Sequence, residues 1–133
     1  KRLTRRVHEL MHAGAQLPRV PESATLREAL VEIVDKGLGV TTVVTADGSL
    51  AGLLTDGDLK RILLGPDGDQ ALREAVSRFM SRTPRSIPPD ALIGAAVRMM
   101  ESGSPVTSLV VVDQGKPLGI LHLHDCLRMA PRS

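Results

Sequence analysis

The sequence has almost no aromatic side chains: Phe79 stands alone, with neither Trp nor Tyr among the 133 residues. Aromatic rings are the usual platforms on which bases of single-stranded nucleic acid stack, so that class of ligand is disfavoured. The formal net charge is only +2, which is too small to indicate a duplex-binding face. We therefore expect no nucleic-acid partner.

Cysteine and long apolar runs are scarce as well. Cys126 is the single cysteine, which excludes an internal disulfide, fits a reducing compartment and is expected to be a buried packing residue. No apolar run approaches the roughly 20 residues needed to cross a bilayer, and no signal peptide is present, so we expect no membrane partner. The chain opens without Met inside a helix-like pattern, and we expect a fragment of a longer protein.

The most informative feature is an internal repeat. Residues 52–58, GLLTDGD, recur 67 positions later as residues 119–125, GILHLHD. The same offset relates the apolar positions of 26–33 to those of 93–100. A repeat of this kind fixes the architecture more firmly than any single motif. Because a half of about 65 residues buries little core alone, we expect the two halves to share one core.

Hydrophobic periodicity predicts the same elements in both halves. Thr25 and Glu28 form the pattern of a capping box for a helix that ends at Gly37. The first half is expected to contain an extended segment at 18–21, that helix, strands at 40–46 and 50–54, and a helix from 58. The second is expected to contain an extended segment at 86–88, a helix from 89 or 90 to about 103, strands at 107–112 and 118–122, and a helix at 123–129. Further helices are expected at 3–12, opening the chain, and at 70–80, connecting the halves.

These elements predict an α+β fold of two β-α-β-β-α repeats related by pseudo-twofold symmetry. We expect a first domain at 1–68, which includes the opening helix, and a second domain at 69–133, which includes the connecting helix. The linker between them is the Gly- and Asp-rich stretch 65–69.

The opening stretch His8-Glu9-Leu10-Met11-His12 matches the HExxH pattern of zinc hydrolases. On a helix, its two imidazoles would share a face and bind zinc, with Glu9 as the general base. No third ligand follows in a suitable arrangement, and the second half has no counterpart of the motif. We therefore expect no catalytic residues and no metal, and retain a zinc hydrolase only as a hypothesis to be tested.

The repeated stretch 52–58 runs from a strand into a helix and places two polar groups at the helix start. The Thr55 hydroxyl and the Asp58 carboxylate lie where free backbone N–H groups and the helix dipole favour a phosphate. A carboxylate beside such a place suits the paired hydroxyls of a ribose. The alternative is that Asp56 or Asp58 only caps the helix.

With the repeat established, each half resembles a cystathionine-β-synthase-type (CBS) domain, and the pair resembles a Bateman module. The two versions at 52–61 and 119–125 are further similar to the C-terminal module of bacterial D-arabinose 5-phosphate isomerases of the KpsF/KdsD type. The resemblance implies a bacterial cytoplasmic enzyme in 3-deoxy-D-manno-octulosonate (Kdo) and lipopolysaccharide biosynthesis. Catalysis would belong to a preceding sugar isomerase domain of the same chain, with no cofactor required by the module.

The resemblance carries a ligand role over to Thr55 and Asp58 in the first repeat and to Asp125 in the second. His122 replaces the threonine there, and an imidazole at a sheet edge can meet a phosphate or a carboxylate. The alternative for His122 and His124 is that both cap the strand end and bond backbone groups. Four further hydroxyl residues open the hairpins and are candidates to line the same clefts, although strand propensity explains them equally well: Thr41, Thr42, Thr107 and Ser108.

The resulting hypothesis is a regulatory nucleotide-binding module that forms a homodimer. We expect its ligand to be the nucleotide sugar CMP-Kdo, acting as feedback from the end of the pathway. Asp58 would accept the ribose hydroxyls, the helix start would hold the phosphate, and His122, His124 and Arg128 would face the sugar carboxylate. Two alternatives remain: a purely structural dimerisation module, and a sensor of the adenine nucleotides AMP or ATP.

Overall fold

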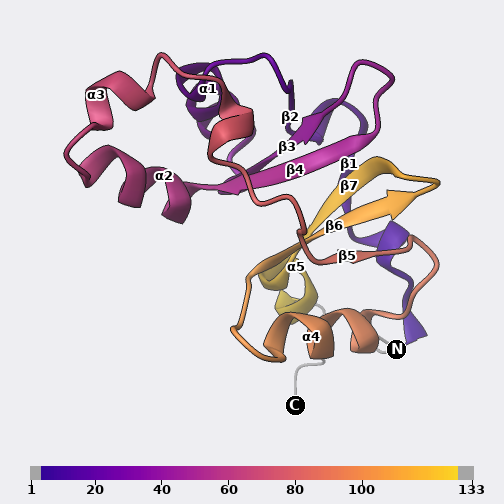
Figure 1. The fold of residues 1–133 in the computed structure, drawn as a ribbon. Helices are drawn as coiled ribbons and strands as arrows, with labels where there is room; N and C mark the ends of the chain where they lie inside the picture. Colours follow the sequence, from indigo (N-terminus) through magenta and orange to yellow (C-terminus); the bar gives the residue numbers. More distant parts are fainter. Residues whose placement is uncertain (1–3, 129–133) are drawn as a thin grey trace. The chain divides into compact units, whose positions relative to one another are not determined.

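The computed structural model describes residues 4–128 and divides the chain into two compact units. One unit is the continuous stretch 18–84. The other joins the residues before 18 to those from 85 onward (Figure 1). Among the described residues, no helix is both long enough and apolar enough to cross a bilayer.

The unit formed by residues 18–84 contains the first repeat. Its elements are β2 (Arg19–Pro21), α1 (Leu26–Lys36), β3 (Val40–Val44), β4 (Leu50–Thr55), α2 (Asp56–Leu64), α3 (Gly68–Ala71) and a 3₁₀ helix at Val76–Arg78. The sheet order is β2-β3-β4, with β2 parallel and β4 antiparallel to β3.

The other unit contains the second repeat. Its elements are β5 (Ser86–Ile87), α4 (Ile93–Glu101), β6 (Ser108–Asp113), β7 (Lys116–His122) and α5 (Leu123–Arg128), joined by 3₁₀ helices at Val7–Glu9 and Gly14–Gln16 and by β1 (His12–Ala13). The sheet order is β1-β7-β6-β5. Strand β1, from the start of the chain, therefore forms the edge of the sheet beside β7 (Figure 1).

Helix α1 has the ends that its sequence predicts. The Thr25 hydroxyl accepts a hydrogen bond from the Glu28 N–H at 3.1 Å, and the Glu28 carboxylate accepts one from the Thr25 N–H at 2.9 Å, completing the capping box. Gly37 ends the helix with φ +73°, a left-handed conformation that glycine adopts without steric cost.

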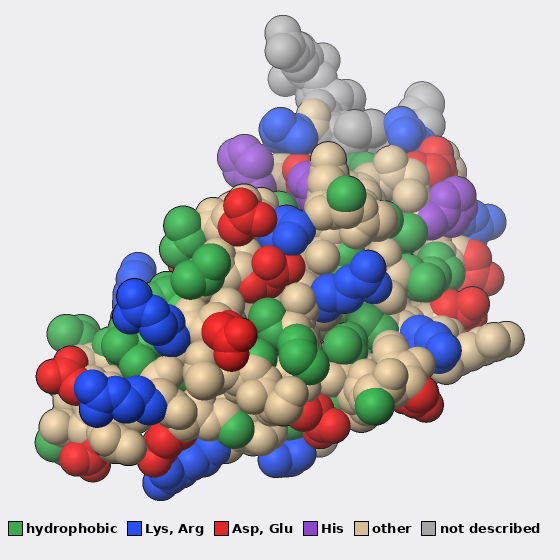
Figure 2. Space-filling model, turned by 90° about the horizontal axis from the view of Figure 1, so that it is seen from above, with side chains coloured by type: hydrophobic (Ala, Val, Ile, Leu, Met, Phe, Trp, Pro, Cys, Tyr) green, Lys and Arg blue, Asp and Glu red, His purple; other side chains and the backbone are tan. Residues whose placement is uncertain are grey.

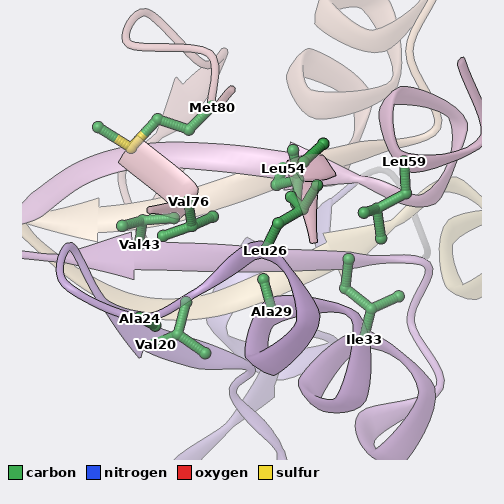
Figure 3. Close-up of a cluster of buried hydrophobic side chains, with 11 residues drawn as sticks. Val20, Ala24, Leu26, Ala29, Ile33, Val43, Leu54, Leu59, Val76 and Met80 are labelled. Atoms are coloured by element: carbon green, nitrogen blue, oxygen red, sulfur yellow. The ribbon is translucent and has the colours of Figure 1, made fainter. Parts of the chain in front are cut away.

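The buried face of α1 packs on the sheet of the same unit. Leu26, Ala29 and Ile33 point from the helix toward the sheet side chains Val43 and Leu54 (Figure 3). Val76, from the 3₁₀ helix, and Met80, after it, belong to the same cluster of buried side chains. In the other unit, counterparts 67 residues on form a second core, which confirms the repeat: Ile93, Ala96, Met100 and Leu121.

Two predicted helices are wrong. Within residues 4–12 the structure has the 3₁₀ helix at Val7–Glu9 and the start of β1, and Leu3 lies outside the described residues. The stretch 70–80 contains the end of α3, a turn and the 3₁₀ helix at Val76–Arg78. In both stretches tertiary contacts take over backbone groups that a long helix would use. Val7 N–H donates to the Ala91 carbonyl and Val76 N–H donates to the Ala24 carbonyl, each at 2.8 Å.

The two 3₁₀ segments perform matching tasks in their units. Val7 and Val76 are both 0% exposed, the first within the core of the second repeat and the second within the core of the first. The compact units therefore differ from the ranges 1–68 and 69–133 expected from the repeat. The segment before the first repeat supplies Val7 to the core of the second repeat. The segment before the second repeat supplies Val76 to the core of the first.

Glycine is required where these segments cross the sheets. A Cβ on Gly52 would lie 2.6 Å from Met80 Sδ and 2.7 Å from the Ser81 carbonyl oxygen. At Gly119, 67 residues later, a Cβ would lie 2.8 Å from Met11 Sδ and 2.9 Å from the His12 carbonyl oxygen. Both repeats thus use a glycine to let a methionine-bearing segment pass close over the strand.

We expect Gly52→Ala to lower the free energy of unfolding by about 1–3 kcal/mol, because the methyl group has to displace a backbone carbonyl as well as a flexible thioether. Chemical denaturation followed by circular dichroism measures the change. Gly48→Ala is a poor control because Gly48 has φ +87°. Ala46→Ser, on the exposed turn beside it, is the better one and should change stability by less than about 0.5 kcal/mol. Equal stability of Gly52→Ala and the natural chain would contradict the close crossing.

Candidate functional site

The first candidate site is the junction of β4 with α2. Thr55 is the N-cap: its hydroxyl accepts the Asp58 N–H at 3.1 Å, and Asp58 Oδ2 accepts the Thr55 N–H at 3.2 Å. Asp58 Oδ1 also pairs with Arg61, whose side chain is 74% exposed. The capping alternative is therefore present in the structure. The Asp58 side chain remains 27% exposed, and its contact with a ligand stays a prediction.

In the second repeat, His122 takes the place of the capping threonine. Its Nδ1 accepts the backbone N–H of His124 at 3.0 Å, so an imidazole caps α5 where a hydroxyl caps α2. This is the backbone-bonding alternative considered for His122. The ring of His124 meets that of His122 edge-on, with centroids 6.5 Å apart, and His124 is exposed.

Asp125 is held on two sides. Its Oδ2 lies 2.7 Å from His12 Nε2, and its Oδ1 accepts a hydrogen bond from Arg128 at 3.0 Å. The second ring nitrogen of His12 lies 3.2 Å from Gln16 Oε1. The structure thus places Arg128 on Asp125, as a neighbour in the helix, and brings in two residues that the sequence analysis did not assign to this site.

The HExxH stretch is divided between two elements. His8 lies in the 3₁₀ helix, and His12 begins β1 and turns its ring toward Asp125. The two imidazoles therefore do not share a helical face, as the zinc-hydrolase hypothesis required. Among residues 4–128, no group of three or more His, Cys, Asp or Glu side chains is arranged to hold a metal ion.

The four hydroxyl residues at the hairpins do not occupy matching positions. Thr41 and Thr42 are fully buried, and their hydroxyls donate to the carbonyls of Thr42 and Pro18. Thr107 is exposed, and its carbonyl accepts the first N–H of α5 in the way that the Gly39 carbonyl accepts the first N–H of α2.

This difference arises because the offset between the repeats changes along the hairpin. Val40 pairs with Thr55, whereas Ser108 pairs with His122. The first strands of the two hairpins are thus 68 residues apart, and the second strands are 67 apart. A role for any of the four hydroxyl residues in ligand binding stays a prediction.

Cys126 is buried, as expected from the sequence, with 2% of its surface exposed. Burial raises the pKa of its thiol, and the neighbouring Asp125 carboxylate raises it further. Cys126 borders a hollow of about 290 Å³ between α4 and α5, and a second hollow of about 380 Å³ borders Arg61 in the other unit. Thr55 and Asp58 are not among the residues that line either hollow.

Charge is distributed without large single-sign areas on the face drawn in Figure 2. There, the basic and acidic side chains of the described residues alternate with apolar ones. This arrangement agrees with the small net charge of the sequence. It offers no extended basic stripe for a nucleic-acid backbone on that face.

The internal repeat, the two strand-to-helix junctions and the similar sheets of the two units define a class of protein. Residues 7–65 and 76–132 each match the family described as "CBS domain". The chain belongs to this family, and its fold is an α+β tandem CBS domain pair.

Among the proteins that the chain resembles are one curated protein and two solved structures. Arabinose 5-phosphate isomerase KdsD of Yersinia pestis is 37% identical over 129 residues, a match that covers 96% of this chain and 38% of that protein. The chain thus spans little more than a third of that relative. A CBS domain-containing protein of Bacillus anthracis superposes with a TM-score of 0.81 at 20% identity, covering 94% of this chain and 91% of that one. CBSX2 of Arabidopsis thaliana in complex with AMP has a TM-score of 0.76 at 24% identity, covering 92% and 93%.

Proposed function

We propose that the chain is a non-catalytic regulatory module that binds a nucleotide at the β4–α2 junction. The observation that carries the proposal is the Asp58 carboxylate, 27% exposed, at the start of a nine-residue helix within a CBS pair. The dipole at that helix start favours a phosphate, although the Asp56 and Asp58 N–H groups are already bonded to Gly39 and Thr55, and the carboxylate can accept the hydroxyl protons of a ribose. The similarity to KdsD supports a role in regulating a sugar-phosphate isomerase, with a preceding isomerase domain as the partner.

For the ligand, we propose CMP-Kdo. The pathway that begins with arabinose 5-phosphate leads to this activated sugar, so binding here would give feedback from the product to the first step. Phe79, the single Phe, Trp or Tyr side chain, lies in the turn that follows the 3₁₀ helix and packs against the core of its unit. The base must therefore be held by backbone groups and aliphatic walls, which suits a small pyrimidine at least as well as a purine.

An adenine nucleotide is the second candidate. The observation in its favour is the AMP complex of CBSX2, which has the same fold, although 24% identity transfers the fold alone. Competitive calorimetry with CMP-Kdo, CMP, AMP and ATP separates the candidates. Tightest binding of CMP-Kdo supports the end-product hypothesis. Tighter binding of AMP or ATP would replace it with an adenine-nucleotide sensor, and absence of any binding would leave a structural module.

We also propose that the module forms a homodimer. Apolar side chains remain exposed on helices α1 and α2 of the first repeat: Val31 (61%), Val34 (72%) and Leu64 (88%). Exposed apolar area of this kind is covered on association in many proteins. We expect sedimentation at tens of micromolar to give twice the mass of the 14.2 kDa chain. Val34→Glu should shift the equilibrium toward monomer, and a natural chain that sediments as a monomer would contradict the proposal.

A further inference from the structure

The two repeats carry the same carboxylate but surround it differently. His12 Nε2 lies 2.7 Å from Asp125 Oδ2, and these residues are 113 positions apart in the chain. Because a carboxylate only accepts hydrogen bonds, Nε2 carries the donated proton whether the imidazole is neutral or cationic. The neutral and the cationic ring can therefore both make this hydrogen bond, which is stronger for the cationic ring.

The arginine neighbours do not explain the difference. Asp58 pairs with Arg61 and Asp125 pairs with Arg128, both three residues on in the helix. The two arginine side chains are 74% and 68% exposed, so solvent screens both pairs to a similar extent. The arginine contact is a common property of the repeats.

The position that differs is that of His12. In β1, His12 lies opposite Ile120, and in the other unit Ser81 bridges to Leu53, which is the repeat counterpart of Ile120. Met11 and Met80, the residues that precede His12 and Ser81, lie close against Gly119 and Gly52, respectively, as described above. Ser81 is therefore the structural counterpart of His12, and its short side chain has no bond to Asp58 among the contacts of the described residues.

We infer that His12 binds the carboxylate of Asp125 in the place where a ligand would otherwise bind it, and so holds the N-terminal segment against α5. Asp58, which has no such histidine among the described residues, is then the carboxylate that is open to a ligand. The exposure of the two carboxylate side chains agrees, since Asp125 is 12% exposed and Asp58 is 27% exposed. The second half of this inference rests on the proposed nucleotide function. On this inference, the residue at this position, His12 in one unit and Ser81 in the other, decides which repeat binds a nucleotide. Each chain then binds one nucleotide.

Transplanting the histidine tests this directly. Ser81→His places an imidazole beside Asp58 in the register that His12 has beside Asp125. We expect it to weaken binding of CMP-Kdo and AMP by about tenfold or more in calorimetry, the loss that follows when a charge-assisted contact is made unavailable. Ser81→Ala, which removes the hydroxyl without adding a partner, is the matched control and should bind like the natural chain. The natural chain should bind one nucleotide per chain.

The tie itself is tested without ligand. Val7 N–H bonds to the Ala91 carbonyl, so its hydrogen exchange measures opening of the N-terminal segment. We expect His12→Ser and Asp125→Ala each to accelerate this exchange by about tenfold, and the double variant to do so no more than either single variant. Exchange of the Leu53 N–H, which bonds to the Ser81 carbonyl in the other unit, should not change.

The outcomes separate the inference from the proposed function. Unchanged binding by Ser81→His, or two nucleotides per natural chain, would overturn the inference while the nucleotide function stands. Binding of no nucleotide by the natural chain would overturn the function, and the exchange experiment then decides the inference. In that case, equal acceleration in the single and double variants supports the tie, and additive or absent acceleration overturns it.

Discussion

Leu54→Ala is expected to lower the free energy of unfolding by about 2–5 kcal/mol, a loss typical of truncating a large, fully buried side chain. Leu54 is fully buried in β4, where it faces Leu26 and Ala29 of α1 in the core drawn in Figure 3. Truncation to alanine loses the free energy gained by burying the apolar side chain, and it leaves a cavity that the close-packed neighbours fill only in part. Urea denaturation measures the loss.

Two further truncations complete that experiment. Leu64→Ala removes the same atoms from a side chain that is 88% exposed, and at concentrations where the chain is monomeric it should change stability by less than about 0.5 kcal/mol. Leu121→Ala removes the repeat counterpart of Leu54 from the other unit, and a loss of similar size is expected. A loss for Leu54→Ala no greater than that for Leu64→Ala would contradict the assigned core.

Asp58→Ala is expected to weaken nucleotide binding by about 1.5–3 kcal/mol, or roughly 10- to 150-fold in Kd. The carboxylate is the group proposed to accept the ribose hydroxyls, and alanine offers no acceptor in its place. Because Asp58 also completes the capping box of α2, the variant should lose about 0.5–2 kcal/mol of stability as well. Calorimetry of folded protein at low temperature separates the two effects.

Helix α1 provides the matched control for Asp58→Ala. Glu28→Ala removes the carboxylate of the other capping box in the same unit and should cost similar stability with no loss of binding. Asp58→Asn keeps an acceptor for the Thr55 N–H but removes the charge, so its stability should stay near that of the natural chain while binding weakens. If Asp58→Ala binds as tightly as Glu28→Ala, Asp58 is only a cap.

Local rules predicted most of the fold correctly where the deciding contacts are short in sequence. The ends of α1 follow from Thr25, Glu28 and Gly37, all of which act within one helical turn of the residues they cap. The same holds for the hairpins and for α2, because the continuous apolar runs of the strands and the turn residues between them are local signals. The duplicated stretch then predicted the pairing of elements in both halves, and the family match of residues 7–65 and 76–132 confirms the tandem CBS pair.

The errors occur where distant backbone groups compete with local preference. The apolar spacing of 3–12 favours a helix, but the carbonyls of Pro89 and Ala91 accept the N–H groups of His8 and Val7. The sequence does not show His12 as the partner of Asp125 for the same reason, because contacts between residues far apart in the sequence bring the two together. From the sequence, His12 is interpreted only as part of a zinc motif. A comparison at an offset of 69 aligns His12 with Ser81, but it also aligns Glu9 with Arg78, so the sequence alone does not single out the position that contacts the carboxylate.

The crossing of the N-terminal segment into the second repeat also imposes an order on folding. During synthesis, β1 is made long before β7, its only strand neighbour in the described sheet. At roughly 5–20 residues per second, residues 4–17 wait on the order of ten seconds for their partner. Residues 18–84 meet no such delay, because every strand of their sheet lies within that stretch. The first repeat is therefore ready to fold as it emerges, while the second can close its sheet only after β7 has been made. Until then the apolar side chains of residues 4–17 are available to other molecules.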